Sequence, residues 1–266
     1  GVDGSAAGTV DKPAATGSVI TCVACHNAAT HAMDSVVMPS GVEIKGLGAE
    51  ARCMQCHQGR ESKISVDKAI ADAGARDDEV SDNLGFLNIH YYAAAATKYG
   101  TLAKGGYEYD GQSYEGNFAH VTGFDTCVGC HDSHSLELKV DACATCHTGV
   151  TKAEDVRNVR MASSLMDYDG DGDISEGIYY ELQGLRDMLL TEAIYPYASE
   201  VAGTPIVYSP DAYPYFFVDT DADGVADADE TQYPNAYKSW TPRLLRAAYN
   251  YQTSAKDPGY TTPSPI

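Results

Sequence analysis

The chain has 266 residues, of which 38 are acidic and only 18 are basic, so its formal net charge is −20. Nucleic acid and anionic membrane surfaces are poor partners for so acidic a body. The most apolar stretch, near Tyr91–Ala96, is far shorter than the roughly 20 residues that a membrane-spanning helix needs. The sequence therefore predicts neither a nucleic-acid partner nor a membrane span.

Composition divides the chain into three regions, at residues 1–20, 21–150 and 151–266. The first consists mainly of Gly, Ala, Ser, Thr and Val without a helical or strand period, which predicts an extended arm. The second contains all eight cysteines and all eight histidines. The third contains neither residue type, and its spacing predicts a mainly helical region.

The second region contains few predicted elements. One helix is predicted over Leu84–Tyr99, with His90 inside it and Gly100 ending it, and a shorter helix is predicted over Ser65–Ala73. Tyrosines at alternate positions around Asp110-Gly111 predict a small hairpin over residues 105–116. We expect the remainder of this region to be irregular.

The third region shows more helical spacing. Helices are predicted over Lys152–Met166, over Glu176–Ala198 and, with proline in its first turn, over Pro242–Tyr251. The Pro-rich end, Asp257–Ile266, is predicted to be extended.

Four copies of Cys-x-x-Cys-His use every cysteine of the chain. They are Cys22/Cys25/His26, Cys53/Cys56/His57, Cys127/Cys130/His131 and Cys143/Cys146/His147. The motif is typical of c-type haem attachment, in which two thiols bond to the porphyrin and the histidine faces the iron. Eight thiolates could instead fill two zinc sites, but the histidine after every second cysteine would be unexplained. A redox disulfide is disfavoured because nothing resembles a thioredoxin unit. The sequence therefore predicts four covalently bound haem c groups.

The haem groups have little polypeptide around them. The motifs run from Cys22 to His147, which leaves about 31 residues for each haem, too few to bury each one separately. The predicted fold is thus that of a multihaem cytochrome c: mostly irregular coil with a few α-helices and little β structure, with the haems forming the core.

Four histidines lie outside the motifs, one for each predicted haem: His31, His90, His120 and His134. We expect the motif histidines to be proximal ligands and these four to be distal ligands of bis-histidine irons. His31 follows His26 by five residues, and His134 follows His131 by three. So short a chain cannot easily pass round the macrocycle, so each is expected to cap a neighbouring haem.

Bis-histidine ligation has a functional consequence. A six-coordinate iron has no position for a substrate, so the sequence predicts electron transfer and no enzymatic activity. The main rival axial ligands are Met33, Met38 and Met54.

Two acidic loops in the third region match calcium-binding patterns. Asp219, Asp221, Asp223, Gly224, Asp227 and Glu230 occupy positions 1, 3, 5, 6, 9 and 12 of a calcium loop, although the flanking residues do not read as EF-hand helices. The first half of the pattern recurs in Asp167, Asp169, Asp171, Gly172 and Asp173. Its twelfth position is Ile178, so Glu176 or Glu181 has to close that site. We predict calcium at both loops, the alternative being Asp/Gly turns that solvate themselves.

The chain resembles the multihaem outer-surface c-type cytochromes of metal-respiring microbes. In the haem region the resemblance is carried by Cys22-Val-Ala-Cys-His-Asn27, by Gly46-Leu-Gly-Ala-Glu-Ala-Arg-Cys-Met-Gln-Cys-His-Gln-Gly-Arg60 and by Asn88-Ile-His-Tyr-Tyr-Ala-Ala-Ala-Ala96. In the third region it is carried by Asp167-Tyr-Asp-Gly-Asp-Gly-Asp173, by Glu176-Gly-Ile-Tyr-Tyr-Glu181 and by Trp240-Thr-Pro-Arg-Leu-Leu-Arg-Ala-Ala-Tyr-Asn-Tyr-Gln252. The haem number and all-histidine ligation are most similar to OmcE-type tetrahaem extracellular cytochromes, whose subunits polymerise into filaments.

The resemblance implies a secreted, cell-surface protein with Gly1 as a mature N-terminus. It implies a head-to-tail homopolymer that passes electrons to redox partner cytochromes, extracellular acceptors or partner cells. It also implies that one distal histidine reaches into the neighbouring subunit. Spacing does not select that histidine, and His31, near the N-terminal arm, is the first candidate. The alternatives are a soluble monomeric periplasmic tetrahaem shuttle and, less favoured, a terminal reductase.

Overall fold

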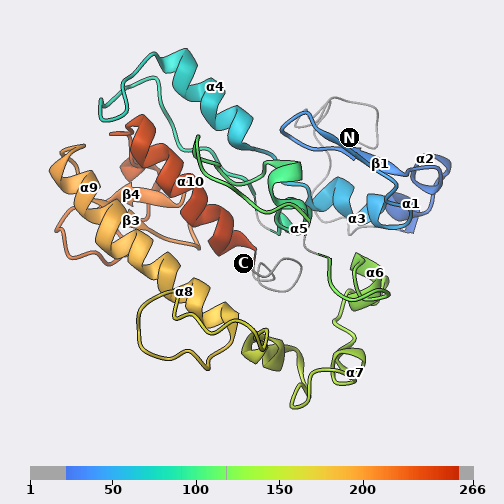
Figure 1. The fold of residues 1–266 in the computed structure, drawn as a ribbon. Coiled ribbons are helices and arrows are strands. Elements are labelled where there is room, and N and C mark those ends of the chain that lie inside the picture. The colour runs from blue at the N-terminus through green and yellow to red at the C-terminus, as the bar shows by residue number, and fades with distance from the viewer. Residues whose placement is uncertain (1–21, 91, 118, 258–266) are drawn as a thin grey trace.

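The computed structural model describes residues 22–90, 92–117 and 119–257, and short helices joined by long irregular segments make up most of it (Figure 1). The α-helices are α1 (Cys22–Cys25), α2 (Ala28–His31), α3 (Glu50–His57), α4 (Lys63–Ala73), α5 (Ala94–Ala103), α6 (Cys127–Cys130), α7 (Val140–Cys143), α8 (Ile178–Met188), α9 (Tyr195–Glu200) and α10 (Pro242–Lys256). The 3₁₀-helices are η1 (Ala153–Asn158) and η3 (Tyr233–Asn235), and a π-helix, η2 (Leu189–Ile194), joins α8 to α9.

Two small antiparallel sheets complete the described structure. Strand β1 (Ser35–Val37) pairs with β2 (Glu43–Lys45), and β3 (Ile206–Tyr208) pairs with β4 (Phe216–Val218). The prediction of mostly coil with a few helices and little β structure is confirmed. Among the described residues, no helix is both long and apolar enough to cross a membrane.

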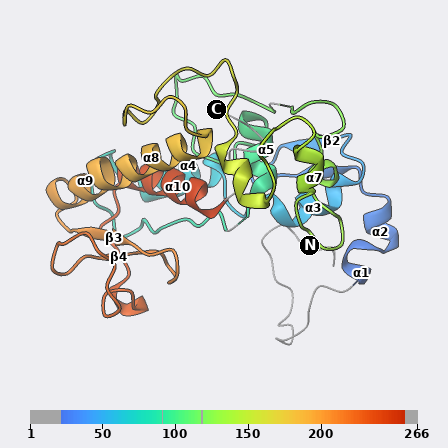
Figure 2. The same ribbon diagram turned by 90° about the horizontal axis from the view of Figure 1, so that it is seen from below.

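Helix α10 packs against α4, α8 and η2. Its buried face includes Leu244, Leu245, Ala248 and Tyr249, and Trp240 is buried just before it. The helix begins where the Thr241 hydroxyl accepts a hydrogen bond from the Leu244 amide at 3.1 Å, a capping contact that satisfies one of the free N–H groups of its first turn. Figure 1 shows α8 and α9 on one side of α10 and α4 on the other, and in Figure 2, which is seen from below, α4 is largely hidden behind α8 and α10.

The packing of α10 crosses the predicted boundary at residue 150. The Tyr249 hydroxyl donates to the Gly105 carbonyl at 2.7 Å, and the Arg243 guanidinium pairs with Asp78 at 2.6 Å. One cluster of buried apolar residues runs from Val36 to Tyr251. The third region, which contains neither cysteine nor histidine, therefore shares a hydrophobic core with part of the second.

The predicted helix over Leu84–Tyr99 is wrong in its first half. Residues 84–90, 92 and 93 are irregular, and the left-handed backbones of His90 (φ 79°) and Tyr92 (φ 55°) cannot continue a right-handed helix. The helix that does form is α5. Gly100, predicted to end it, forms a kink (φ 45°) where the backbone approaches the Glu115 carbonyl.

The predicted hairpin over residues 105–116 has no strands. The turn exists, since Gly111 has φ 82° and the Gln112 amide donates to the Tyr109 carbonyl at 3.3 Å. However, both backbone groups of Tyr107 are hydrogen-bonded to the Asn250 side chain. The Tyr107 amide donates to the Asn250 side-chain oxygen at 2.7 Å, and the Asn250 side-chain nitrogen donates to the Tyr107 carbonyl at 2.9 Å. A side chain of α10 thus replaces the cross-strand partner.

The other helices are confirmed in part. The prediction over Ser65–Ala73 corresponds to α4, that over Glu176–Ala198 to α8, η2 and α9, and that over Pro242–Tyr251 to a longer α10. The prediction over Lys152–Met166 is wrong except for η1, because the Arg160 guanidinium holds the chain in a loop through the carbonyls of Ser164 and Met166. The N-terminal arm and most of the Pro-rich end lie outside the described residues.

A buried ion pair joins the elements around the second and third motifs. The Glu50 carboxylate on α3 accepts from Lys98 on α5 at 2.6 Å and from the Cys127 amide of α6 at 2.9 Å. The side chains of Glu50 and Lys98 are only 9% and 11% exposed. Removing one member of such a pair leaves an uncompensated buried charge, which is strongly destabilising.

We therefore expect Lys98→Met to lower the free energy of unfolding of the haem-loaded protein by about 3 kcal/mol. The matched control is Lys68→Met on α4, which breaks a solvent-exposed pair with Asp72 (side chains 70% and 66% exposed) and is expected to cost at most about 0.5 kcal/mol. Denaturant titrations of both variants measure the difference. Equal losses would show that the Glu50 contact is not a structural anchor.

Candidate haem and cation sites

Each of the four Cys-x-x-Cys-His motifs folds into one tight turn, on α1, α3 and α6 for the first three motifs and directly after α7 for the fourth. The amides of His26, His131 and His147 donate to the carbonyl of the first cysteine of their motif at 2.8–2.9 Å, and the second motif is the last part of α3. This i to i+4 turn places two thiols and one imidazole on neighbouring positions of the same face. Such an arrangement can hold one flat group by two covalent bonds and one axial ligand.

The eight cysteines are all free thiols, and half of them are exposed: Cys22, Cys25, Cys56 and Cys146. No disulfide forms across any motif. Within the described ranges, the only groups of three or more side chains positioned to share a metal ion consist of carboxylates. The thiols are thus neither crosslinked nor gathered as a zinc site would require.

The segment that carries the third and fourth motifs lacks apolar packing of its own. Between Glu108 and Gly149, no described apolar residue is buried, and Val121 and Leu136 are 58% and 69% exposed. Helices α6 and α7 lie in this segment, at the lower right of Figure 1 and apart from the layers around α10. A large apolar group held by the motif cysteines would supply the missing core, so the residues present fit haem c.

Hydrogen bonds to the backbone orient two motif imidazoles. The ring nitrogen Nδ1 of His57 lies 2.7 Å from the Tyr92 carbonyl, and Nδ1 of His131 lies 3.0 Å from the Leu136 carbonyl. A carbonyl can only accept, so Nδ1 carries the proton and Nε2 is left with its lone pair for a metal. This is the tautomer that an axial iron ligand requires.

Two of the spare histidines lie against motif histidines. The ring centroids of His26 and His134 are 6.2 Å apart, and those of His120 and His147 are 6.1 Å apart. Both pairs join segments that are distant in sequence. The expectation that His134 serves a haem other than that of His131 agrees with this position.

The two other spare histidines have different surroundings. His31 lines a cavity of about 360 Å³ with Cys25, His26 and Arg52. His90 is half-buried, its amide donates to the Asn88 side chain at 2.9 Å, and burial followed by the charge of Arg60 lowers its pKa. A lowered pKa keeps the imidazole neutral, which is the form that binds a metal.

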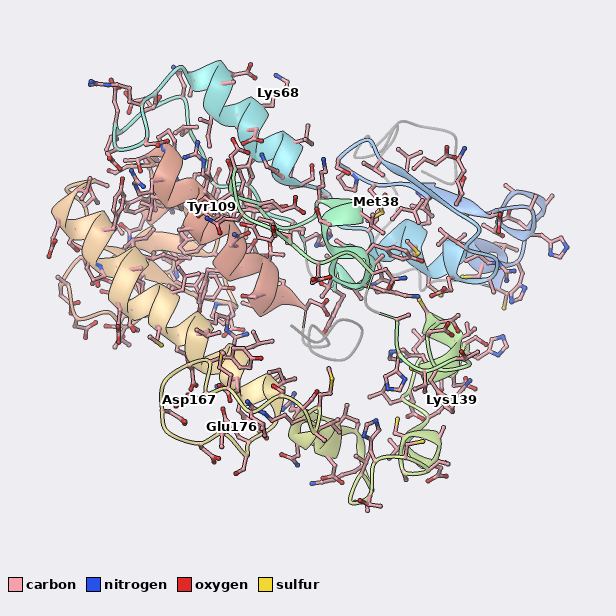
Figure 3. The ribbon with its side chains drawn as sticks, in the orientation of Figure 1. Met38, Lys68, Tyr109, Lys139, Asp167 and Glu176 are labelled. Atoms are coloured by element: carbon pink, nitrogen blue, oxygen red, sulfur yellow. The ribbon has the colours of Figure 1, made fainter. Side chains whose placement is uncertain are left out.

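The rival methionines pack elsewhere. Met38 and Met54 are 2% and 1% exposed inside the apolar core, and Met33 packs against it. Figure 3 labels Met38 between β1 and α5. Their side chains therefore fill the core, which favours the histidines as the axial ligands.

The second and third motifs lie close to each other. The Cys127 thiol and amide both donate to Glu50 of α3, at 3.1 Å and 2.9 Å. The interaction between the thiols of Cys53 and Cys127 lowers the pKa of Cys53 to about 6. Other motifs are also neighbours: besides burial, the charge of Cys25 raises the pKa of Cys56, and that of Cys143 raises the pKa of Cys130.

The two acidic loops have the same pattern of hydrogen bonds. In the loop that starts at Asp219, its carboxylate accepts from the amides of Ala222 at 2.8 Å and Gly224 at 2.9 Å. In the loop that starts at Asp167, the carboxylate accepts from the corresponding amides of Gly170 and Gly172. The fourth and sixth positions have positive φ in both loops, with Ala222 at 60° where the other loop has glycine.

A buried glutamate closes the later loop. Oxygens of Asp219, Asp221 and Glu230 lie within 4.8 Å of one another, as do those of Asp221, Asp223 and Asp227. Burial raises the pKa of Asp221, and the charges of Asp223 and Glu230 add to this effect. Burial also opposes ionisation of Glu230, but hydrogen bonds from the Thr220 amide and hydroxyl lower its pKa overall.

Both glutamates considered for the earlier loop approach it. Asp167 and Asp169 lie within 4.8 Å of Glu181, and Asp169 and Asp171 lie equally close to Glu176. Figure 3 shows Asp167 and Glu176 on the same loop beneath α8. Asp173, by contrast, bonds to Ser175 and belongs to neither group.

Two residues that contact the earlier loop, Arg160 and Gly184, were not predicted from the sequence. The Arg160 guanidinium pairs with Glu181, whose side chain is fully buried. A Cβ atom at Gly184 of α8 would collide with the Asp169 carboxylate, so a glycine is required for this close approach. Neither contact leaves a local signal, since both partners are distant in sequence. Arg160 also neutralises part of the charge, so the Asp219 loop is the more favourable cation site.

Curated relatives place these motifs in context. The chain is 31% identical over 243 aligned residues, covering 78% of its length, to the C-type polyheme cytochrome OmcB of Geobacter sulfurreducens, in both strain DL-1/KN400 and strain PCA. In an alignment 288 positions long, which covers 95% of its length, it is 29% identical to the C-type polyheme cytochrome OmcC of strain PCA.

The chain spans less than a third of the length of these relatives, 28% of OmcB and 32% of OmcC. No family model and no solved structure matches it. The relatives' description as polyheme cytochromes nevertheless agrees with the chemistry of the four motifs. Together they support the assignment of this chain to the multihaem c-type cytochrome family.

Proposed function

We propose that the chain transfers electrons through four c-type haems, each held by the two cysteines of one motif and by two axial histidines. The observation that carries this proposal is the pairing of four helical Cys-x-x-Cys-His turns, whose thiols are all free, with four further histidines. Bound haem would supply an iron centre that is reduced and oxidised by one electron. The similarity to polyheme cytochromes supports the same function.

In this proposal the protein's own residues hold and close the irons. The backbone acceptors at His57 and His131 fix the ring tautomer that leaves Nε2 free to bind the metal. With a second histidine as ligand, each iron would have no open position for a substrate or for oxygen. The chain therefore passes electrons without acting as an enzyme.

The ferric haem-loaded protein is expected to be entirely low-spin, and its reduced form is expected to bind no carbon monoxide. Replacing any one of the four spare histidines by alanine opens one iron of four, so about one carbon monoxide per chain then binds. Met33→Ala is the control and is expected to bind none. High-spin haem in the unaltered protein would contradict bis-histidine ligation and favour a reductase.

We also propose that the chain is the repeating subunit of an extracellular cytochrome filament that passes electrons to external acceptors or partner cells. The support is the resemblance to tetrahaem filament subunits in haem number and in all-histidine ligation. A filament requires a head-to-tail interface that does not close on itself. The redox partners would be other cytochromes and acceptors outside the cell.

Electron microscopy of the purified protein tests this proposal. We expect filaments that persist on dilution, with a repeat of one subunit. Isolated particles at all concentrations would favour the monomeric shuttle. Light scattering on the same samples checks that any filaments are not formed on the grid.

We propose further that the two acidic loops bind calcium. Each loop gathers at least three carboxylates within 4.8 Å, and each includes a buried glutamate, Glu230 or Glu181. Hard divalent cations prefer such oxygen ligands. The ion would neutralise carboxylates that otherwise repel one another.

Calorimetric titration of chelator-treated haem-loaded protein with calcium is expected to show two sites. Asp219→Asn removes one and Asp167→Asn the other, because each takes away the first ligand of its loop. Asp229→Asn changes an exposed carboxylate in the later loop that belongs to no cluster, and it is expected to keep both sites. If the variant that carries both Asp219→Asn and Asp167→Asn still releases or absorbs heat on calcium binding, calcium binds elsewhere.

A further inference from the structure

The two close histidine pairs have the separation of ligands that share one iron. Imidazoles on opposite faces of a haem iron have ring centroids about 6 Å apart, because a metal–nitrogen bond is about 2 Å long and the nitrogen lies roughly 1 Å from its ring centroid. The measured separations are 6.2 Å for His26 and His134, and 6.1 Å for His120 and His147. The ring planes are inclined by 21° and 41°, and ligation leaves rotation about the metal–nitrogen bond free.

We propose that His134 is the second axial ligand of the haem attached at Cys22 and Cys25, and that His120 is the second axial ligand of the haem attached at Cys143 and Cys146. This assignment rests on the proposed bis-histidine function and specifies its ligand pairs. The pairs join positions that are 108 and 27 residues apart in the chain. Nothing in the spacing alone selects them.

One tight turn presents His134 away from its own motif. The Asp132 carboxylate accepts from the amides of His134 and Ser135 at 2.9 Å and 2.8 Å. The Leu136 carbonyl at the other end of the turn holds Nδ1 of His131. The turn thus fixes the imidazole of His131 for the third haem and offers the imidazole of His134 to the first.

The second pair is built from the segment before the third motif. His120 packs edge-on against Phe124, with ring centroids 6.5 Å apart, and the chain then enters α6 at Cys127. His147 ends the fourth motif, which follows α7. The segment that leads into the third motif therefore caps the fourth haem.

The assignment leaves His31 and His90 for the second and third haems. His31 is then excluded as the ligand of the first haem, which agrees with its separation of only five residues from His26 along the chain. The segment of the third motif contributes to the first haem through His134 and to the fourth through His120. The third motif thereby connects both ends of the series.

Haem-deleted backgrounds test the pairing. In the full protein, His134→Ala and His120→Ala are each expected to raise carbon monoxide binding from none to one per chain. In a Cys22→Ser/Cys25→Ser background, which lacks the first haem, His134→Ala is expected to open no iron, whereas His120→Ala still opens one. In a Cys143→Ser/Cys146→Ser background the two results are exchanged. An iron opened by His134→Ala in the first background overturns the assignment of His134.

A second measurement covers the case in which a haem-deleted variant does not mature. His134→Met keeps all four haems, and NMR is expected to show contacts from the introduced methyl group to the haem whose thioethers come from Cys22 and Cys25. Contacts to the Cys127 and Cys130 haem would refute the pairing. The unaltered protein separates the two proposals: open irons there contradict bis-histidine ligation, whereas closed irons with a different deletion pattern contradict only the pairing.

Discussion

The segments that carry the first, third and fourth motifs have no hydrophobic core of their own, and much of the structure follows from this shortage. Around α6 and α7 the chain forms tight turns closed by backbone and Asp side-chain hydrogen bonds, with none of its apolar residues fully buried. Such turns do not bury enough apolar surface to offset the entropy of ordering. Covalently held haem would contribute both the buried surface and the crosslinks that hold the turns in place.

The second motif is the exception, because α3 packs into the shared core through Ala51 and Met54. Glu50 on the same helix then connects the core to the third motif through the Cys127 amide. Helix α3 thus connects the well-packed elements around α10 to the weakly packed turns of the third and fourth motifs. The haem-free region serves as a support for this helix and its neighbours, which gives a structural reason for its presence beside an electron-transfer region.

Local patterns predicted much of this molecule, and long-range contacts account for several of the failures. The motifs, α4 after Ser62 and α10 after Thr241 are defined by neighbouring residues, so the sequence was sufficient. The hydrogen bonds of Tyr107 to Asn250 depend on a partner far along the chain, and the left-handed backbone at His90 leaves no pattern that the helical spacing could show. The same limit applied to the sites. Spacing indicated that His134 would not bind the same haem as His131, but only the fold placed His134 beside His26.

The long reach of α10 bears on the timing of assembly. Its hydrogen bonds join Asn250 to Tyr107 and Arg246 to Asp77, across 143 and 169 residues. Contacts of such high sequence separation form slowly, since the entropy of closing a long loop must first be overcome. Because α10 follows all four motifs, the shared core cannot close until every motif cysteine has been synthesised. The connectivity thus provides a period in which the thiols stay accessible, so haem attachment can precede the final packing.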